Sequence, residues 1–381
     1  VVIALDEHGR VLDVFQSDTD HPSSDIEFHQ GFICPGFINT HCHLELSHLK
    51  GKMKERTGIA AFIKQLLDVR SAYTQYEVES AIAEAEKEMI VNGIAAVGDI
   101  SNGNISYPQK AKNNLWYHTF IEILGVLPGK TDLIFSAGEH LMSLYKETVP
   151  NANVSISPHA PYSVSPQLLD KINQHAVKNA TLVTIHNQES KAEEDFFLKG
   201  KSSINEIFDA AKVNIDFWKA KPENSLRTFL PLLFDSKKLL LVHNTYTSQE
   251  DIQWVQFQTS NFQLPIFFCT CPNANLFIEN TLPDYNSFVA ENVKMTVGTD
   301  SYASNWSLSI LDELKTISKH FPHIPLETQL TWATKNGAEF FGLEKQFGTI
   351  EKGKKPGLVF IKNVDTKNRK LTEKSCVQVL A

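Results

Sequence analysis

The stretch that is most informative about the fold is Pro35-Gly36-Phe37-Ile38-Asn39-Thr40-His41-Cys42-His43-Leu44-Glu45. The apolar run 32–38 predicts a buried strand that leads into the two histidines. If the alternation of side chains along a strand continues through the pair, His41 and His43 point to the same side. Two imidazoles that project together from a strand end can chelate one transition-metal ion. Because a His-X-His pair is not specific by itself, the interpretation depends on whether similar residues follow other strands.

Short apolar segments alternate with helical patterns through most of the chain after Gly31. This alternation predicts parallel strands joined by right-handed helical crossovers, and eight such units predict an α/β fold of the (β/α)8 TIM-barrel type. The core strands are expected near 34–40, 94–100, 115–122, 153–158, 181–186, 238–243, 264–270 and 293–299. The helical periodicity is clearest at 58–71, 77–91, 166–178, 307–320 and 326–341.

The two ends of the chain have a different pattern. A turn at 6–9 between two alternating segments predicts a hairpin, and 348–353 with 357–361 resembles a further strand-turn-strand. We therefore expect residues 1–33 and 345–381 to form one small β domain beside a hydrolase barrel that spans 34–344. The segment at about 190–221 is longer than a simple connection, so it is interpreted as an insertion over the barrel mouth.

Composition excludes several classes of protein. Hydrophobic residues make up 42% and charged residues 21% of the chain, as in ordinary globular proteins. A net charge of −8 and the lack of a Lys/Arg cluster argue against a nucleic-acid partner. The chain contains no apolar run of about 18 residues, so no membrane span is expected. Five cysteines have no disulfide-type spacing. One of the four Asn-X-Ser/Thr sequons lies in a predicted buried strand and one in an expected site loop, which favours a non-glycosylated, cytoplasmic protein. No signal peptide is apparent at Val1, although the chain does not begin with Met.

Residues that bind metals or transfer protons follow five of the predicted strands. In a parallel barrel the catalytic groups lie at the C-terminal ends of the strands. Each residue alone has a structural explanation, since an Asp at a strand end is commonly a helix cap. Five strand ends that all carry such residues are a less probable coincidence. They are His41 with His43, then His159, then His186 with Glu189, then His243 and finally Asp300.

With these residues in view, the chain resembles the amidohydrolase superfamily, in the branch of deaminases and chlorohydrolases. That branch includes the deaminases of guanine, S-adenosylhomocysteine and aminodeoxyfutalosine and the atrazine chlorohydrolase group. The resemblance spans nearly the whole chain and rests on PGFINTHCHLE, SPHAPYS, HNQES, VHNT, CPNANL and GTDSYASN in one order. One departure is CPNAN at 271–275, where the family usually has Cys-Pro-X-Ser-Asn.

The resemblance implies a single divalent metal. Zinc is the expected ion and iron the alternative, because both suit three His and one Asp. The end of strand 153–158 carries no lysine, whereas two-metal branches have a carbamylated lysine there, which supports one metal. The implied ligands are His41, His43, His186 and Asp300.

The resemblance also implies roles for other residues. Glu189 would be the proton shuttle, and His243 would contact the substrate or the activated water. Asp300 would additionally accept the proton of that water. His159 and Asn305 are expected to bind substrate, whereas Glu45 either faces the substrate or caps the next segment.

The resulting hypothesis is metal-dependent deamination of an amino-substituted heterocycle of the purine-nucleoside type, such as an adenosine-type compound or aminodeoxyfutalosine. The expected partner is this small molecule, and a homodimer is left open. One alternative is a chlorohydrolase or amidase that acts on a related ring, and another is a catalytically silent metal-binding barrel. Glu189 favours deamination because chloride leaves with less help from a proton donor, and the complete set of ligands argues against a silent barrel.

Overall fold

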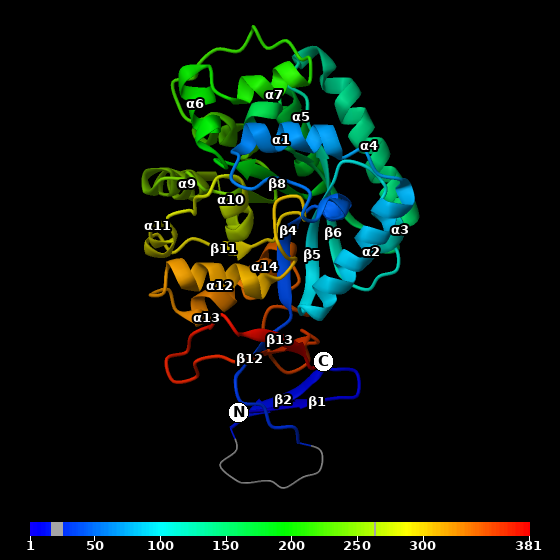
Figure 1. Ribbon diagram of the computed structural model, residues 1–381, viewed down its shortest axis with the longest axis vertical. Helices are drawn as coiled ribbons and strands as arrows, with labels where there is room; N and C mark the ends of the chain where they lie inside the picture. Colours follow the sequence, from blue (N-terminus) through cyan, green and yellow to red (C-terminus); the bar gives the residue numbers. More distant parts are fainter. Residues whose placement is uncertain (17–25, 263) are drawn as a thin grey trace.

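The computed structural model describes residues 1–16, 26–262 and 264–381 (Figure 1). Its centre consists of two four-stranded parallel sheets, of order β4-β5-β6-β7 and β11-β10-β9-β8. All eight predicted core strands are present, and the predicted α/β barrel is confirmed. The strands are β4 (Phe37–Cys42), β5 (Ile94–Ser101), β6 (Trp116–Ile123), β7 (Asn153–Pro158), β8 (Leu182–Asn187), β9 (Lys238–His243), β10 (Ile266–Thr270) and β11 (Met295–Val297).

Backbone hydrogen bonds near the strand ends join the two sheets into a barrel. Between β7 and β8, the amide of His186 donates to the carbonyl of His159 at 2.9 Å. Between β11 and β4, the amides of Thr299 and Asp300 both donate to the carbonyl of His41, at 3.1 and 3.0 Å. Closure therefore takes place at the same end of the barrel as the predicted catalytic residues, and it brings the first and last strands together.

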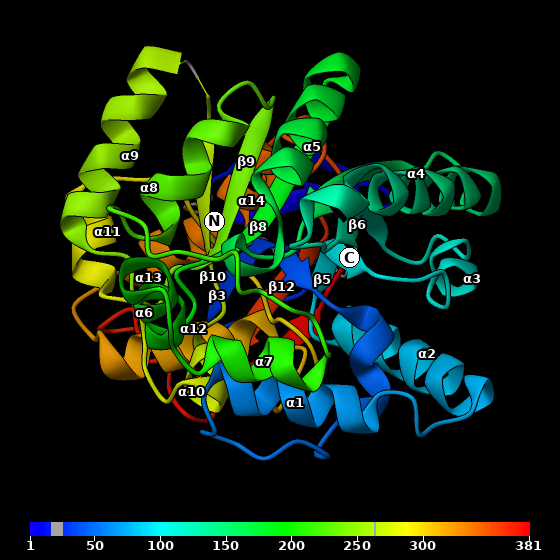
Figure 2. The ribbon, with the colours of Figure 1, turned by 90° about the horizontal axis from the view of Figure 1, so that it is seen from above.

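Helices surround the barrel when the molecule is seen from above (Figure 2). None of the helices in the described part of the chain combines the length and apolarity that a membrane span needs. The helices are α1 (Ile59–Val69), α2 (Gln75–Val91), α3 (Tyr107–Lys110), α4 (Thr131–Thr148), α5 (Pro166–Asn179), α6 (Lys191–Lys199), α7 (Ile204–Ala210), α8 (Ser225–Phe229), α9 (Gln249–Phe262), α10 (Pro272–Ile278), α11 (Tyr285–Ala290), α12 (Ile310–His320), α13 (Leu326–Ala333) and α14 (Lys335–Phe341).

The single helix predicted over 326–341 is wrong, because the structure has two helices there. Thr334 separates α13 from α14 with φ −134° and ψ −78°, which is not a helical conformation. The break allows α14 to pack against the barrel, where Phe340 contacts Phe120 and Phe267 with ring centroids 6.4 and 5.4 Å apart. These side chains belong to one buried hydrophobic cluster together with residues of the barrel strands. Tertiary packing of α14 therefore determines where the helix breaks.

The chain termini form the β structure at the end of the molecule shown lowest in Figure 1. The predicted hairpin is present, with β1 (Val2–Leu5) antiparallel to β2 (Val11–Phe15). A second sheet, of order β13-β12-β3, joins β3 (Phe32–Pro35) to β12 (Leu358–Lys362) and β13 (Cys376–Val379). Residues 17–25 of the predicted N-terminal part lie outside the described residues.

The strand predicted at 348–353 is not formed. Gly348 and Gly353 adopt φ +87° and +89°, which is incompatible with an extended strand. The chain turns here instead, and Gly353 donates a backbone hydrogen bond to the carbonyl of Val11 at 2.7 Å. This bond ties the C-terminal segment to the N-terminal hairpin, although not through the strand pair that the sequence suggested.

A fully buried ion pair connects the outside of β5 to α3. The Nζ atom of Lys110 lies 2.5 Å from Asp99, and both side chains are 0% exposed. Lys110 also donates to the hydroxyls of Ser101 and Thr119 at 3.0 and 2.9 Å. Asp99 in turn accepts a 2.7 Å hydrogen bond from the amide of Leu44, the residue after His43. The pair thus joins the packing behind β5 to the loop that follows the first two histidines.

We predict that Lys110→Met destabilises the protein by about 3–5 kcal/mol, because it leaves the carboxylate of Asp99 buried without a counter-charge. The double variant Lys110→Met/Asp99→Asn should recover part of this loss, since it removes both charges and keeps an oxygen that can accept from Leu44. Urea unfolding followed by circular dichroism measures both effects. A single variant as stable as the wild type would contradict the prediction.

Candidate metal centre and catalytic cavity

The His41-Cys42-His43 segment lies at the end of β4, which is buried along its whole length. The Nε2 atoms of His41 and His43 lie 3.2 Å apart, so the two rings converge as the alternation predicted. The hydrogen bond from Leu44 to Asp99 fixes the backbone immediately after His43. The rigid strand on one side and the anchored loop on the other hold both rings in one orientation.

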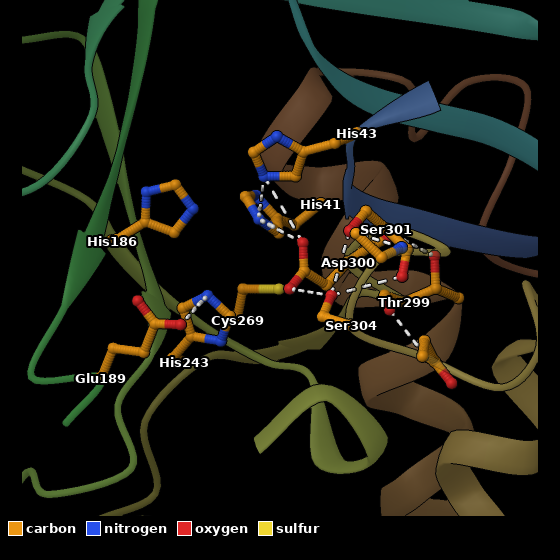
Figure 3. Close-up of polar contacts among 12 residues, drawn as sticks. His41, His43, His186, Glu189, His243, Cys269, Thr299, Asp300, Ser301 and Ser304 are labelled. Carbon is orange, nitrogen blue, oxygen red and sulfur yellow. Dashed lines mark hydrogen bonds and ion pairs between the residues drawn. The ribbon is translucent and has the colours of Figure 1, made fainter. Parts of the chain in front are cut away.

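Asp300 follows β11 and faces this pair of histidines (Figure 3). Its backbone has φ +57°, a left-handed conformation that is uncommon for a residue other than glycine and that is concentrated at functional sites. The Oδ2 atom accepts a 2.7 Å hydrogen bond from the hydroxyl of Ser304. The Oδ1 atom lies 3.4 Å from Nε2 of His43 and 3.8 Å from Nε2 of His41. One carboxylate oxygen is therefore anchored, and the other is directed at the imidazoles.

His186 at the end of β8 and His243 at the end of β9 complete the cluster, and their rings stack with centroids 5.3 Å apart. Nδ1 of His186 lies 2.7 Å from the carbonyl oxygen of His159. Because a carbonyl can only accept, Nδ1 carries the proton and Nε2 keeps its lone pair. Nδ1 of His243 is likewise paired with the amide oxygen of Asn275 at 2.9 Å. Such outer partners orient the rings of metal-binding histidines.

These residues fit a divalent cation. Three sets of ligand atoms each lie within 4.8 Å of one another, and His41 belongs to two of them: His41, His43 and Asp300, and His41, His186 and His243; the third is Glu122, His159 and His186. Burial lowers the pKa of His41 and of His186 well below the usual value, with further lowering from neighbouring histidines, which favours the neutral form of both rings. Converging lone pairs repel unless a cation or a proton lies between them. The mixture of nitrogen and carboxylate ligands is one that zinc and iron accept.

Glu189 stands beside this cluster, with Oε1 3.5 Å from Nε2 of His243. The turn that carries it is held by the start of α6. Ser190 caps that helix by accepting from the amide of Glu193, whose carboxylate accepts from the amides of Gln188 and Glu189. Burial raises the pKa of Glu189 well above its usual value, and the charge of Asp300 adds to the effect. This environment favours a carboxyl group that holds a proton.

A cavity of about 440 Å³ opens over the cluster and contacts His43, His186, Glu189, His243 and Asp300. Its other walls are mostly apolar and come from α1, from the loop after β6 and from α7. The segment predicted as an insertion at about 190–221 forms α6 and α7, and α7 lies along α1 in both ribbon views (Figures 1 and 2). A polar floor with apolar walls is typical of a pocket that binds a small molecule.

Of the three predicted substrate-binding residues, His159 lines this cavity, whereas Glu45 and Asn305 are not among its lining residues. Nδ1 of His159 pairs with the hydroxyl of Ser163 at 2.7 Å. The carboxylate of Glu45 accepts hydrogen bonds from the amides of Asn102 and Gly103 at 3.1–3.3 Å. Glu45 is thus engaged in holding the loop after β5.

Asn305 is also occupied by contacts within the protein. Its amide nitrogen donates to the carbonyl of Thr299 and to the carboxylate of Glu313, each at 2.7 Å. Its side-chain oxygen accepts from the amides of Trp306 and Ser307. These bonds fix the conformation of the loop that carries Asp300.

Sequence reasoning missed Glu122, Asn275 and Ser304. Glu122 ends β6 inside the cavity, and a carboxylate between Ile121 and Ile123 in an apolar strand was the signal that could have identified it. Asn275 belongs to the CPNAN motif, but the motif does not reveal that its partner is His243. Ser304 contacts Asp300 only because the loop folds back on itself, which no local pattern indicates.

Comparison with known proteins places this site in a family. An adenosine deaminase of Helicobacter pylori is 26% identical over 339 residues, which cover 87% of this chain and 79% of that protein. The crystal structure of Helicobacter pylori aminofutalosine deaminase with methylthio-coformycin is 25% identical, with a TM-score of 0.74 over 89% of this chain and 80% of that one.

The zinc complex of atrazine chlorohydrolase from Arthrobacter aurescens is 16% identical, with a TM-score of 0.70 over 100% of this chain and 90% of that one. At that identity the likeness shows a shared fold alone. Residues 32–380 match the family model described as the amidohydrolase family. This match extends over most of the sequence, from β3 to the end of β13. The chain is therefore a member of the amidohydrolase family.

Proposed function

We propose that this protein is a metal-dependent aminohydrolase that removes an amino group from a purine-like heterocycle, with a nucleoside of the adenosine type as the leading substrate. The observation that carries the proposal is the position of Glu189, which is buried in the cavity 3.5 Å from His243 and beside the imidazole-carboxylate cluster. Relatives named as adenosine and aminodeoxyfutalosine deaminases, at 26% and 25% identity, support this class of substrate.

In this proposal His41, His43, His186 and Asp300 hold one divalent ion, with zinc expected. When bound, such an ion would lower the pKa of a water molecule on it towards about 7. Asp300 Oδ1 faces the histidines and would bind the ion, so Oδ2, which accepts a hydrogen bond from Ser304, would be the oxygen that takes the proton of the reacting water. His243 is fixed by Asn275 and presents Nε2 to the oxygen that adds to the ring carbon.

Glu189 accounts for the preference for an amino leaving group. Addition of water to the ring carbon places electrons on an adjacent ring nitrogen, and a protonated Glu189 can neutralise that charge by donating its proton. The proton that Asp300 took from the water then passes to the amino group, the carbon–nitrogen bond breaks, and the amine leaves as ammonia. Chloride needs no proton in order to leave, so a buried proton donor at this position favours deamination over dechlorination.

We predict that Glu189→Gln lowers the rate of ammonia release by about 10²–10⁴-fold, because the amide cannot donate and recover a proton as the carboxyl group does. The measurement is ammonia release by metal-replete protein with adenosine, aminodeoxyfutalosine, guanine and related aminopurines. The metal content should not change, since Glu189 is outside the proposed ligand set. A variant that keeps more than a tenth of the wild-type rate would remove Glu189 from the mechanism.

We predict one tightly bound divalent ion per chain, identified as zinc by plasma mass spectrometry. His41→Ala should lose most of this metal together with activity, because His41 lies in both sets of converging ligand atoms. The matched control is His140→Ala, which removes an exposed histidine on α4. Full metal content in His41→Ala, or equal loss in the control, would show that the ion binds elsewhere.

A further inference from the structure

Glu122 is a buried carboxylate that the proposed mechanism does not use. It lies at the end of β6, is 6% exposed and lines the cavity beside His159 and His186. A ring nitrogen of each histidine and a carboxylate oxygen of Glu122 lie within 4.8 Å of one another. The residue therefore stands on the opposite side of His186 from the proposed metal, in a place where a bound substrate can touch it.

The two oxygens of Glu122 have different surroundings. Oε2 accepts a 2.9 Å hydrogen bond from the side-chain amide of Asn102, which also donates to the backbone carbonyl of Glu122 at 3.1 Å. Oε1 lies 3.6 Å from Nδ1 of His186, but that nitrogen already donates its proton to the carbonyl of His159 at 2.7 Å. Among the described residues, Oε1 thus has no hydrogen-bond donor of its own, although its carboxylate is held firmly in place.

These contacts argue against a role limited to orienting His186. The ring of His186 is oriented by the shorter bond to the carbonyl of His159, which would persist without Glu122. The cations that line the cavity, Arg70 and Lys130, are both solvent-exposed, and among the described residues neither forms an ion pair with Glu122. A substrate that displaces water from the cavity must then supply a hydrogen-bond donor to Oε1, or leave a buried acceptor unpaired.

The position of Glu122 along the cavity indicates which part of the substrate this donor belongs to. Glu122 lies within 4.8 Å of ring nitrogens of His159 and His186, which belong to the polar floor beside the proposed metal ligands. The residues that follow Glu122 in the chain, among them Leu124, Val126 and Leu127, line the apolar wall of the same cavity. The donor therefore belongs to the part of the substrate between the reacting ring and an apolar substituent.

We propose that Glu122 is a specificity-determining residue that accepts a hydrogen bond from a hydroxyl group of the substrate, at the point where the heterocycle joins its substituent. In a nucleoside this part is the sugar, so the site selects sugars that retain their vicinal hydroxyls. The inference rests on the proposed function for the class of heterocycle, but it concerns binding, which can be measured separately from turnover.

The test compares adenosine with 2′,3′-dideoxyadenosine by calorimetric titration. Binding is measured in Glu189→Gln protein, so that turnover does not consume the ligand, with and without Glu122→Gln. Loss of one charged hydrogen bond should weaken adenosine binding by about 10–100-fold and dideoxyadenosine binding by less than about 3-fold. The metal content should stay at the level of the parent protein. Glu139→Gln, at an exposed position on α4, serves as the matched control.

Equal weakening for both nucleosides, or loss of metal from Glu122→Gln, would overturn the inference in favour of a purely structural role. Glu122→Asp, which keeps the charge but withdraws the oxygens, should show the same selective loss if Glu122→Gln does not fold. If wild-type protein binds adenosine in this Glu122-dependent way but releases no ammonia, the proposed function fails and the hydroxyl contact stands. If neither nucleoside binds, both fail.

Discussion

The site depends on closure of the barrel at the carbonyl oxygen of His41. This one oxygen accepts hydrogen bonds from the amides of Thr299 and Asp300, which joins the last strand to the first. The side chains of Asn39 and Thr299 reinforce the same seam, with Nδ2 of Asn39 donating to the hydroxyl of Thr299 at 2.7 Å and the amide of Thr299 donating to Oδ1 of Asn39 at 3.0 Å. Residues separated by more than half of the chain thereby become neighbours, and Asp300 reaches the two histidines without a flexible loop.

The same geometry creates an electrostatic cost that the protein compensates locally. Four buried or nearly buried imidazoles and two carboxylates share a small volume. Burial lowers the pKa of His41, His186 and His243 and raises the pKa of Glu189. Partners outside the cluster satisfy the atoms that point away from its centre: the His159 carbonyl for His186, Asn275 for His243 and Ser304 for Asp300. The atoms that point inward remain available, which is the arrangement expected of a preorganised cation site.

The sequence was sufficient for the barrel and for the residues at its strand ends, because both follow from local patterns. Alternating apolar segments and helices specify parallel strands, and polar residues directly after those strands must meet at one end of a barrel. Supporting contacts were not predictable in the same way. Glu45 and Asn305 follow strand ends like the others, yet a long-range bond to the loop after β5 occupies Glu45, and a bond to Glu313 in the next helix occupies Asn305. The break at Thr334 likewise reflects packing of α14 against the barrel, which helical periodicity does not encode.

Side chains from separate strand ends are proposed to bind one catalytic metal ion beside Glu189. The decisive measurement is anomalous diffraction at the zinc absorption edge, on crystals of the metal-replete protein. We expect a single strong peak about 2.0–2.2 Å from nitrogen atoms of His41, His43 and His186 and from Oδ1 of Asp300. A peak centred between Glu122 and His159, or two peaks of equal height, would contradict this assignment of the ligands.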